Sequence, residues 1–298
     1  MLHLTFDKDF TKKEIWQIFK LAKKLKDKQK KGESHELLRG KSLAMIFQKP
    51  STRTRVSFET AITQLGGHAQ YLSVSDLQLG RGETIKDTAK VLSRYVDGIM
   101  ARVFSHQDII DLAKNSNVPV INGLSDKFHP CQALTDLFTI WEKRQKLKNL
   151  TMVFVGDGDN NVTNSLLLIC DILGVELKIA CPDKYRTKKE ILDLAKRKIE
   201  ISNNLKTIVK NADVIYTDTW ISMGREDEKE REIILTPYQV NQKLVSLAKK
   251  DAIVMHCLPA HRNHEITDEI MDGPHSIIFD QAENRLHVQK AILVKLLK

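Results

Sequence analysis

Short apolar runs alternate along the whole chain with segments whose apolar residues recur at helical spacing. The runs are three to five residues long and are bounded by polar or Gly/Pro-containing turns, which is typical of buried strands. The predicted strands are residues 43–47, 70–73, 98–101, 119–121, 152–155, 176–180, 214–216, 253–256 and 277–279. The predicted helices between them include residues 85–95, 133–146, 165–173 and 188–201.

This alternation predicts an α/β fold with parallel sheets. The chain has 298 residues, which is enough for two domains of ordinary size. A polar stretch at 145–149 follows a long predicted helix and is the best boundary. We therefore expect two doubly wound parallel-sheet domains, residues 1–145 and 146–281, with a C-terminal helix at about 282–298 that packs back on the first domain.

The composition is that of a soluble globular protein, with 42% hydrophobic and 29% charged residues. No apolar run approaches the roughly 18 residues that span a bilayer. The first residues lack the layout of a signal peptide. The four cysteines show no close pairing, so we expect a reduced, cytoplasmic protein without membrane contact.

The net charge of +9 raises the question of nucleic-acid binding, because lysines crowd residues 23–31. These lysines lie on a predicted helix that begins at Thr11, where Thr11 and Glu14 form a capping box. The helix has its own apolar stripe, and lysines opposite such a stripe are usually a solvated face. No nucleic-acid motif accompanies them, so we expect no nucleic-acid partner.

The most informative stretch is Lys49-Pro50-Ser51-Thr52-Arg53-Thr54-Arg55, between a predicted strand and a predicted helix. Ser51 or Thr52 is a natural N-cap, and the helix N-terminus is itself an anion site. Arg53 and Arg55 add planar guanidinium groups, and the threonines add hydroxyl donors. The alternative is an ordinary capped helix with solvated arginines. Two arginines and three hydroxyls in one helix start favour a phosphate site.

Four more candidate residues of the first half lie in loops or near the ends of elements. Gln78 lies in a Gly-containing loop, 76–84, which by itself predicts only a surface loop. Arg102 ends a strand, where ligands gather in open α/β sheets, so it is a candidate contact for an anion or a carbonyl. His129 is predicted at a helix N-cap and Gln132 one turn later. A lone histidine is more often structural, but the two together favour a site.

In the second half, the loop 156–161 lacks the full G-x-G-x-x-G pattern of nucleotide loops. Asp157 and Asp159 would repel a pyrophosphate, so the loop better suits a ligand with an ammonium group. Asp218 follows another predicted strand and could pair with an amine, while Ser222 and a backbone N–H could hold a carboxylate. An amino acid needs this combination.

A histidine-rich segment follows the predicted strand 253–256. His256, Cys257, His261 and His264 are potential zinc ligands, but the paired cysteines that structural zinc sites usually recruit are missing. We therefore expect no metal, and we expect the Cys257 thiol to lie against a substrate instead.

Together these stretches resemble the aspartate/ornithine carbamoyltransferase family. The run 51–55 matches its carbamoyl-phosphate signature, and His129-Pro130-Cys131-Gln132 matches its H-P-x-Q motif. Asp218 followed by Ser222-Met223-Gly224, and His256-Cys257-Leu258-Pro259, are similar to the branch that uses ornithine. The aspartate branch has another residue in place of Cys257 and no S-M-G. The resemblance extends from about residue 6 to the C-terminus.

The resemblance implies one domain for carbamoyl phosphate and one for ornithine, with the active site in the cleft between them. It also implies a homotrimer, alone or assembled further, in which Gln78 reaches the site of a neighbouring subunit. It implies no cofactor, because carbamoyl phosphate is already activated.

The implied reaction transfers the carbamoyl group of carbamoyl phosphate to the δ-amine of L-ornithine, giving L-citrulline and phosphate. The implied carbamoyl-phosphate contacts are Ser51, Thr52, Arg53, Thr54, Gln78, Arg102, His129, Gln132, Cys257, Leu258 and Arg285, the last at the start of the final helix. The implied ornithine contacts are Asn161, Asp218, Ser222 and Met223. Arg102 and His129 would stabilise the oxyanion, and Asp218 and Cys257 would orient and help to deprotonate the amine.

Two alternatives remain open at this point. The acceptor could be putrescine or acetylornithine, although putrescine has no carboxylate for Ser222 and Met223 to hold. A non-catalytic module that binds a phosphorylated metabolite is the other alternative, although it would need only the first phosphate site. The sequence is compatible with both synthesis and breakdown of arginine.

Overall fold

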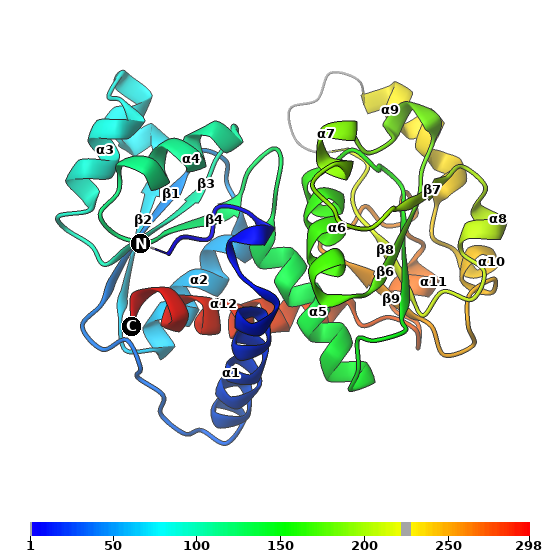
Figure 1. Ribbon diagram of the computed structural model, residues 1–298, viewed down its shortest axis with the longest axis horizontal. Coiled ribbons are helices and arrows are strands. Elements are labelled where there is room, and N and C mark those ends of the chain that lie inside the picture. The colour runs from blue at the N-terminus through cyan, green and yellow to red at the C-terminus, as the bar shows by residue number, and fades with distance from the viewer. Residues whose placement is uncertain (1, 222–227) are drawn as a thin grey trace. The chain divides into compact units, whose positions relative to one another are not determined.

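The computed structural model describes residues 2–221 and 228–298 (Figure 1). The chain divides into two compact units, each with its own sheet. Unit 1 comprises Met1–Phe138 and Asn284–Lys298, and unit 2 comprises Thr139–Glu283. The divisions fall inside two helices, α5 (Pro130–Arg144) and α12 (Ile278–Leu297).

Unit 1 contains a parallel four-stranded sheet in the order β2-β1-β3-β4. Its strands are β1 (Ser42–Phe47), β2 (His68–Ser73), β3 (Gly98–Arg102) and β4 (Val120–Leu124). Its helices are α1 (Lys12–Lys30), α2 (Thr52–Gln64), α3 (Ile85–Leu92) and α4 (His106–Asn115), with parts of α5 and α12 and short 3₁₀ helices at Asp7–Asp9, Val74–Asp76 and Gln78–Arg81.

Helices cover both faces of this sheet, which explains why its central strands are continuous apolar runs. Ala44 and Ile46 of β1 pack with Ala89 of α3 and Ile109 of α4 in one apolar cluster. In Figure 1, α3 and α4 lie on one side of the sheet, and α2 and α12 lie on the other. The doubly wound arrangement of unit 1 is therefore as the sequence predicts.

The lysine-rich helix α1 has the capping box predicted for it. The Thr11 side chain accepts from the Glu14 N–H, and the Glu14 carboxylate accepts from the Thr11 N–H at 2.9 Å. The predicted apolar stripe, which includes Ile15 and Phe19, is buried. Lys26 is the exception among the lysines, because it is buried and donates to the Asn284 side chain at 2.7 Å.

Unit 2 contains a parallel five-stranded sheet in the order β7-β6-β5-β8-β9. Its strands are β5 (Thr151–Val155), β6 (Glu176–Ala180), β7 (Glu200–Ser202), β8 (Val214–Thr217) and β9 (Ile253–His256). Its helices are α6 (Asn161–Leu173), α7 (Lys189–Leu192), α8 (Leu205–Ile208), α9 (Glu228–Leu235), α10 (Gln242–Val245) and α11 (Asp268–Met271), with 3₁₀ helices at Asp183–Tyr185 and Thr236–Tyr238.

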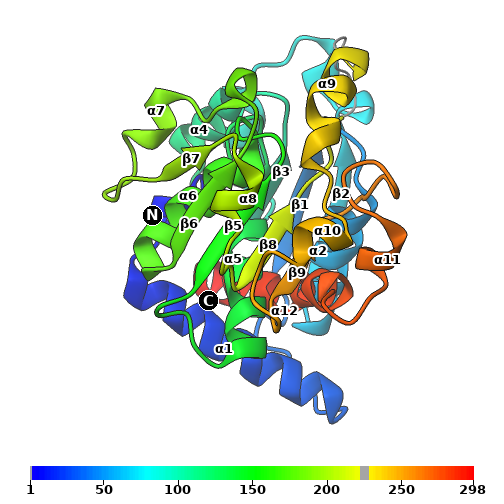
Figure 2. The ribbon, with the colours of Figure 1, turned by 90° about the vertical axis from the view of Figure 1, so that its right-hand side faces the viewer.

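Helices also cover both faces of this sheet. Val153 and Ile215 pack with Ile208 of α8, Val245 of α10 and Ile270 of α11 in one cluster. Figure 2 shows α8, α10 and α11 over one face of the sheet, and Figure 1 shows α6 along the other.

Two predicted elements are wrong. The segment 188–201, predicted as a helix, has only the four residues of α7 in helical form and ends in the edge strand β7. Pairing with β6, where Lys178 also forms an ion pair with Glu200 at 2.8 Å, prevails over the local pattern. The segment 277–279, predicted as a strand, leads into α12, which therefore begins earlier than the predicted residue 282.

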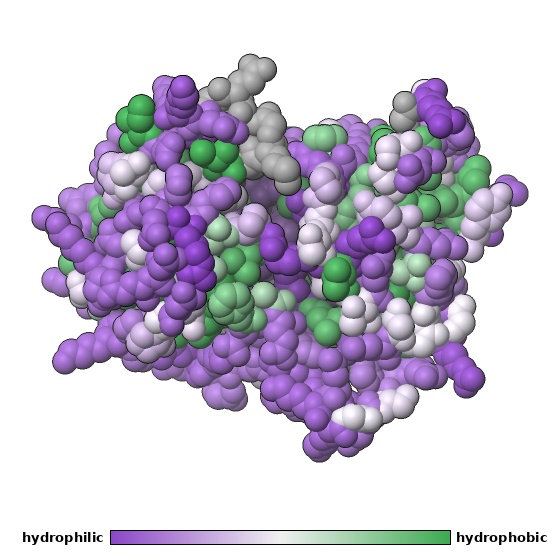
Figure 3. Space-filling view, turned by 180° about the vertical axis from the view of Figure 1, so that it is seen from behind, coloured by the Kyte–Doolittle hydropathy of each residue, from purple (hydrophilic) through white to green (hydrophobic). Residues whose placement is uncertain are grey.

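The face in Figure 3 is mostly hydrophilic, with hydrophobic side chains in small separate groups. Among the described residues, no helix has the length and hydrophobicity that crossing a bilayer requires.

Candidate active site

The predicted site residues of each unit lie where the strand order reverses. In unit 1 the chain passes from β1 outward to β2 and then returns to β3 on the other side of β1. The loop that begins α2 follows β1, and Arg102 is the last residue of β3. Ligands of open α/β sheets bind outside the carboxyl ends of strands at such a reversal, so this edge is the candidate anion site.

Ser51 is the N-cap of α2, one of the two caps that the sequence allows. Its backbone is extended (φ −162°), and its hydroxyl accepts from the Thr54 N–H at 3.3 Å. Thr52 is exposed and Arg53 is partly exposed in the first turn. The helix start thus presents hydroxyl, guanidinium and backbone N–H groups, as the phosphate-site prediction requires.

A buried threonine hydroxyl joins two guanidinium groups in unit 1. Thr54 is fully buried, and its Oγ1 accepts from Arg285 Nη2 at 3.1 Å and from Arg102 Nη1 at 3.4 Å. Arg285 comes from α12, more than 200 residues after Thr54. The structure therefore brings these three predicted site residues together from α2, β3 and α12.

His129 belongs to the same group. Its carbonyl accepts from the N–H groups of Gln132 and Ala133, so it is the N-cap residue that the sequence predicts for α5. Burial, and then the positive charges of Arg285 and Arg102, hold the pKa of His129 well below its usual 6.5. The imidazole is therefore neutral at pH 7, and one ring nitrogen carries a proton to donate.

Gln132 is buried one turn after His129. Its Nε2 donates to Asp136 Oδ1 at 2.8 Å, and its Oε1 is buried without a hydrogen-bond partner among the described residues. An unsatisfied buried acceptor is costly, so Oε1 is suited to a ligand N–H such as an amide.

Two residues of the first half lie apart from this group. Arg55 donates to Glu59 at 3.0 Å, and its guanidinium lies 3.7 Å from the centre of the Tyr71 ring. The guanidinium predicted to bind phosphate is thus engaged by side chains of the chain itself. The Gln78 side chain is exposed, between two leucines, Leu77 and Leu79, that pack on the core cluster of unit 1.

In unit 2 the strand order reverses between β5 and β8. Asp218 follows β8, and Cys257 follows the neighbouring strand β9. The Cys257 thiol donates to Asp218 Oδ1 at 2.9 Å, and the Thr219 N–H donates to the same oxygen at 2.8 Å. Burial raises the pKa of Asp218, while the nearby His256 and the Cys257 bond act against that rise.

His256 fixes the backbone beside this pair. Its Nδ1 accepts from the Leu258 N–H at 2.8 Å, so its proton lies on Nε2, which contacts Glu265 Oε1 at 3.1 Å. Both His256 and Glu265 are fully buried. The donor atoms of Asp218, His256 and Cys257 lie within 4.8 Å of one another, a spacing that a metal ion could use. However, both ring nitrogens of His256 already form hydrogen bonds, so His256 offers no lone pair to a metal ion. Only Asp218 and Cys257 then remain as ligands in this group.

The loop after β5 differs from our interpretation. Asp157 bonds the buried Arg231, and Asp159 pairs with Lys188 at 3.2 Å. The two carboxylates are thus occupied by cations of the chain itself, and a ligand ammonium group is not needed to explain them. Asn161 is the first residue of α6 and is partly exposed at the end of this loop.

Two predicted ornithine contacts, Ser222 and Met223, lie outside the described residues. Nothing in the structure therefore bears on them.

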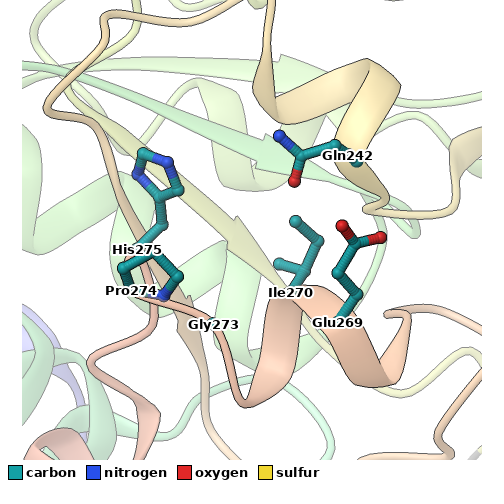
Figure 4. A pocket seen from close by; sticks show the side chains of 6 residues that line it. All are labelled: Gln242, Glu269, Ile270, Gly273, Pro274 and His275. Atoms are coloured by element: carbon teal, nitrogen blue, oxygen red, sulfur yellow. The ribbon is translucent and has the colours of Figure 1, made fainter.

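Figure 4 shows a small pocket of unit 2 whose lining includes none of the predicted site residues. Its volume is about 120 Å³, below the usual range of ligand pockets. His275 bonds the carbonyl of Ala252, which precedes β9, so the pocket lies at the amino end of that strand, away from Cys257. It is lined by Gln242, Glu269, Ile270, Gly273, Pro274 and His275.

Sequence reasoning missed two buried charged residues of unit 2. Glu265 orients His256, and Arg231 joins the loop after β5 to the loop after β8. Both lie in polar, charged segments that look like surface. No local signal distinguishes them, because their burial depends on partners that are distant in the sequence.

The comparisons with known proteins cover nearly the whole chain. The description "aspartate/ornithine carbamoyltransferase, carbamoyl-P binding domain" matches residues 2–142, and "aspartate/ornithine carbamoyltransferase, Asp/Orn binding domain" matches residues 148–296. The chain is 56% identical to the ornithine carbamoyltransferase of Pyrococcus horikoshii, with 97% of this chain and 93% of the relative covered. It is 56% identical to the protein of Pyrococcus furiosus named "ornithine carbamoyltransferase, anabolic", with 96% and 93% covered.

Solved structures agree. The ornithine carbamoyltransferase of Pyrococcus furiosus has a TM-score of 0.95 at 54% identity, with 99% of this chain and 96% of that chain covered. That of Thermus thermophilus has a TM-score of 0.91 at 40% identity, with 100% and 99% covered. By sequence and by structure, the chain belongs to the aspartate/ornithine carbamoyltransferase family.

Proposed function

We propose that the chain is an enzyme that transfers the carbamoyl group of carbamoyl phosphate to the δ-amine of L-ornithine, giving L-citrulline and phosphate. The observation that carries this choice of acceptor is the contact between the Cys257 thiol and Asp218, at 2.9 Å. A carboxylate and a thiol at the carboxyl ends of adjacent strands suit an amine nucleophile. The similarity to proteins named ornithine carbamoyltransferase supports the same acceptor.

Carbamoyl phosphate is assigned mainly to unit 1. Ser51, Thr52, Arg53 and Thr54 bind the phosphate, because the helix N-terminus and the guanidinium group favour an anion. Gln132 Oε1 accepts from the carbamoyl NH₂ group, in keeping with its buried and unsatisfied position.

Two cations and one neutral imidazole then act on the carbonyl group. Arg102 bridges the phosphate and the carbonyl oxygen, and Arg285 holds the carbamoyl end. Neutral His129 donates to the oxygen as negative charge develops on it in the tetrahedral intermediate. The low pKa of His129 suits this role, because the group remains a neutral donor at pH 7 and does not lose its proton in the step.

Ornithine is assigned to unit 2. Asn161, Asp218, Ser222 and Met223 bind its α-amino and α-carboxylate groups. Free amines of this kind are mostly protonated at pH 7, and the δ-amine must lose a proton before it attacks.

The last two groups assigned to the reaction are the Cys257 thiol and the Leu258 carbonyl. Cys257 orients the δ-amine and, with Asp218, assists its deprotonation. The Leu258 carbonyl accepts from the carbamoyl NH₂, and its place is fixed by the bond from the Leu258 N–H to His256. Most of the catalysis is then orientation and electrostatics, and no cofactor takes part.

The domain assignment follows the same division: residues 1–145 with 282–298 serve carbamoyl phosphate, and residues 146–281 serve ornithine. We further propose a homotrimer in the cytoplasm, in which the exposed Gln78 reaches a neighbouring subunit. Support for Gln78 comes from its exposure between two anchored leucines. The relative named "anabolic" supports the biosynthetic direction of arginine metabolism.

The proposal is tested by citrulline formation from carbamoyl phosphate with L-ornithine, putrescine, acetylornithine and L-aspartate in parallel. We expect turnover with L-ornithine alone. Turnover with another amine would keep the carbamoyl-phosphate half and overturn the acceptor assignment. Tight binding of carbamoyl phosphate without turnover of any amine would favour a metabolite-binding module.

A further inference from the structure

A buried arginine joins two loops at the strand ends of unit 2. Arg231 lies on α9 and is only 2% exposed. Its Nε–H donates to the Trp220 carbonyl at 2.8 Å, and its Nη2 donates to the buried carboxylate of Asp157. The guanidinium also lies 4.5 Å from the centre of the Tyr185 ring, within the range of a cation–π contact.

The bonds from Arg231 to Trp220 and Asp157 form a bridge between the two loops. At its Asp157 end, the bridge holds the loop that leads into α6. The second carboxylate oxygen of Asp157 accepts from the Asp159 N–H at 2.8 Å. The Asp157 carbonyl accepts from Asn160 Nδ2 at 3.0 Å and from Thr163 Oγ1 at 3.1 Å. Asp157 therefore sets the turn whose next helical residue is Asn161.

The Trp220 end holds the loop after β8. Trp220 is two residues after Asp218 and is 3% exposed. Gly156 has φ +132°, and a Cβ at this position would lie 3.4 Å from Trp220 Nε1, so the indole packs against the glycine backbone. The two loops thus touch at Gly156 and are tied together by Arg231.

Burying a guanidinium is expensive unless its partners are well placed, and a buried ion pair often adds little net stability. The pair thus needs a reason other than stability. Its two ends lie next to Asn161 and Asp218, the described residues that we assign to the amino-acid substrate.

We propose that Arg231 is a positioning residue that sets the distance between Asn161 and Asp218 and thereby determines the affinity for the amino-acid substrate. This inference rests on the proposed function. Arg231 itself touches no substrate. It acts by holding the Trp220 carbonyl and the Asp157 carboxylate in fixed places.

The inference predicts different effects on the KM values for the two substrates. Arg231→Lys keeps a positive charge near Asp157 but cannot make both directional bonds, because lysine lacks the planar fork. We expect its KM for L-ornithine to rise about tenfold or more, while its KM for carbamoyl phosphate stays within twofold of wild type. Asp157→Asn keeps an oxygen for the Asp159 N–H and weakens the bridge from the other end, so we expect a smaller change in the same direction.

The matched control is Glu230→Gln, on the residue next to Arg231. Glu230 pairs with Lys184 across the exposed surface, with both side chains at least half exposed. This change removes an ion pair of α9 without touching the bridge, so both KM values should equal those of wild type. Thermal unfolding of every variant reports whether the fold is intact.

Wild-type turnover is measured first, because its absence would overturn the proposed function and not the role of Arg231. Given wild-type turnover, an unchanged ornithine KM in Arg231→Lys would overturn the positioning role. So would a parallel loss for both substrates, or failure of both Arg231→Lys and Asp157→Asn to fold, since the bridge would then serve the fold in general. If only Arg231→Lys fails to fold, Asp157→Asn decides: a raised KM for ornithine alone supports the inference, and an unchanged KM overturns it.

Discussion

Replacing Thr54 with valine tests the cation group of unit 1. Thr54 is fully buried, and its hydroxyl oxygen accepts from Arg285 at 3.1 Å and from Arg102 at 3.4 Å. Valine has nearly the same shape but no acceptor, so each guanidinium loses one buried partner.

The magnitude follows from these two distances. A hydrogen bond to a charged group contributes about 1.5–3 kcal/mol. The Arg285 bond has ordinary length, whereas the Arg102 contact exceeds the usual upper limit of about 3.2 Å and adds little. Thr54→Val should therefore lower the free energy of unfolding by about 2 kcal/mol, which lowers the thermal midpoint by about 4–8 °C for a unit of this size. If the transition state loses the same amount, kcat/KM for carbamoyl phosphate falls about 30-fold.

The assay combines thermal unfolding with initial rates at saturating L-ornithine and varied carbamoyl phosphate. Thr54→Ser is the control, because it keeps the hydroxyl and removes one methyl group, at a cost of about 1 kcal/mol. It should lower the midpoint and leave kcat/KM nearly intact. The reasoning would be refuted by a Thr54→Val enzyme whose midpoint falls while its kcat/KM for carbamoyl phosphate stays within threefold of wild type.

Three further changes address single groups. Burial raises the pKa of Asp218, so the folded chain binds this proton more readily than the unfolded chain, and stability declines as pH rises through the window above 3.8. Asp218→Asn should then match or exceed the wild-type thermal midpoint at pH 7 while kcat with L-ornithine falls at least about 100-fold; a lower midpoint would contradict the sign. Burial with Arg285 and Arg102 lowers the pKa of His129, so the unfolded chain takes up this proton first and stability is lost as pH falls below 6.5. His129→Asn should make the midpoint less sensitive to pH between 7 and 5, and an unchanged slope would count against a neutral, buried imidazole. Cys257→Ser keeps a donor to Asp218 on a shorter bond, so kcat should fall about tenfold, and Cys257→Ala should fall further in the same steady-state assay.

The strands could be predicted because a strand covered on both faces is a continuous apolar run. Residues 176–180 and 253–256 have the predicted bounds in the structure. The edge strand at 200–202 has no such run, since only three residues pair and one face of the pairing is polar. Its conformation is set by β6, which the local sequence does not reveal.

Site residues were predictable where one short stretch carries the chemistry. The run 51–55 combines a cap, hydroxyls and guanidinium groups, and its Ser51 cap is confirmed. The pairing of Asp157 with Arg231 could not be seen, because the two residues are 74 positions apart. From the sequence alone, Asp157 indicated a ligand ammonium group, whereas the partner that balances its charge comes from α9.

The site residues at the two reversals of strand order have opposite charges, positive in unit 1 and negative in unit 2. This difference matches the charges of the two substrates. In unit 1, Arg102 and Arg285 converge on a neutral hydroxyl. His129 stays uncharged because burial, and then the charges of the two arginines, lower its pKa. The two guanidinium groups make this part of unit 1 suited to a phosphate dianion. In unit 2, Asp218 is a partly buried carboxylate with a thiol donor, and an ammonium group would balance its charge. Each unit therefore presents charged groups of the sign opposite to that of its substrate group, so substrate binding should stabilise each unit.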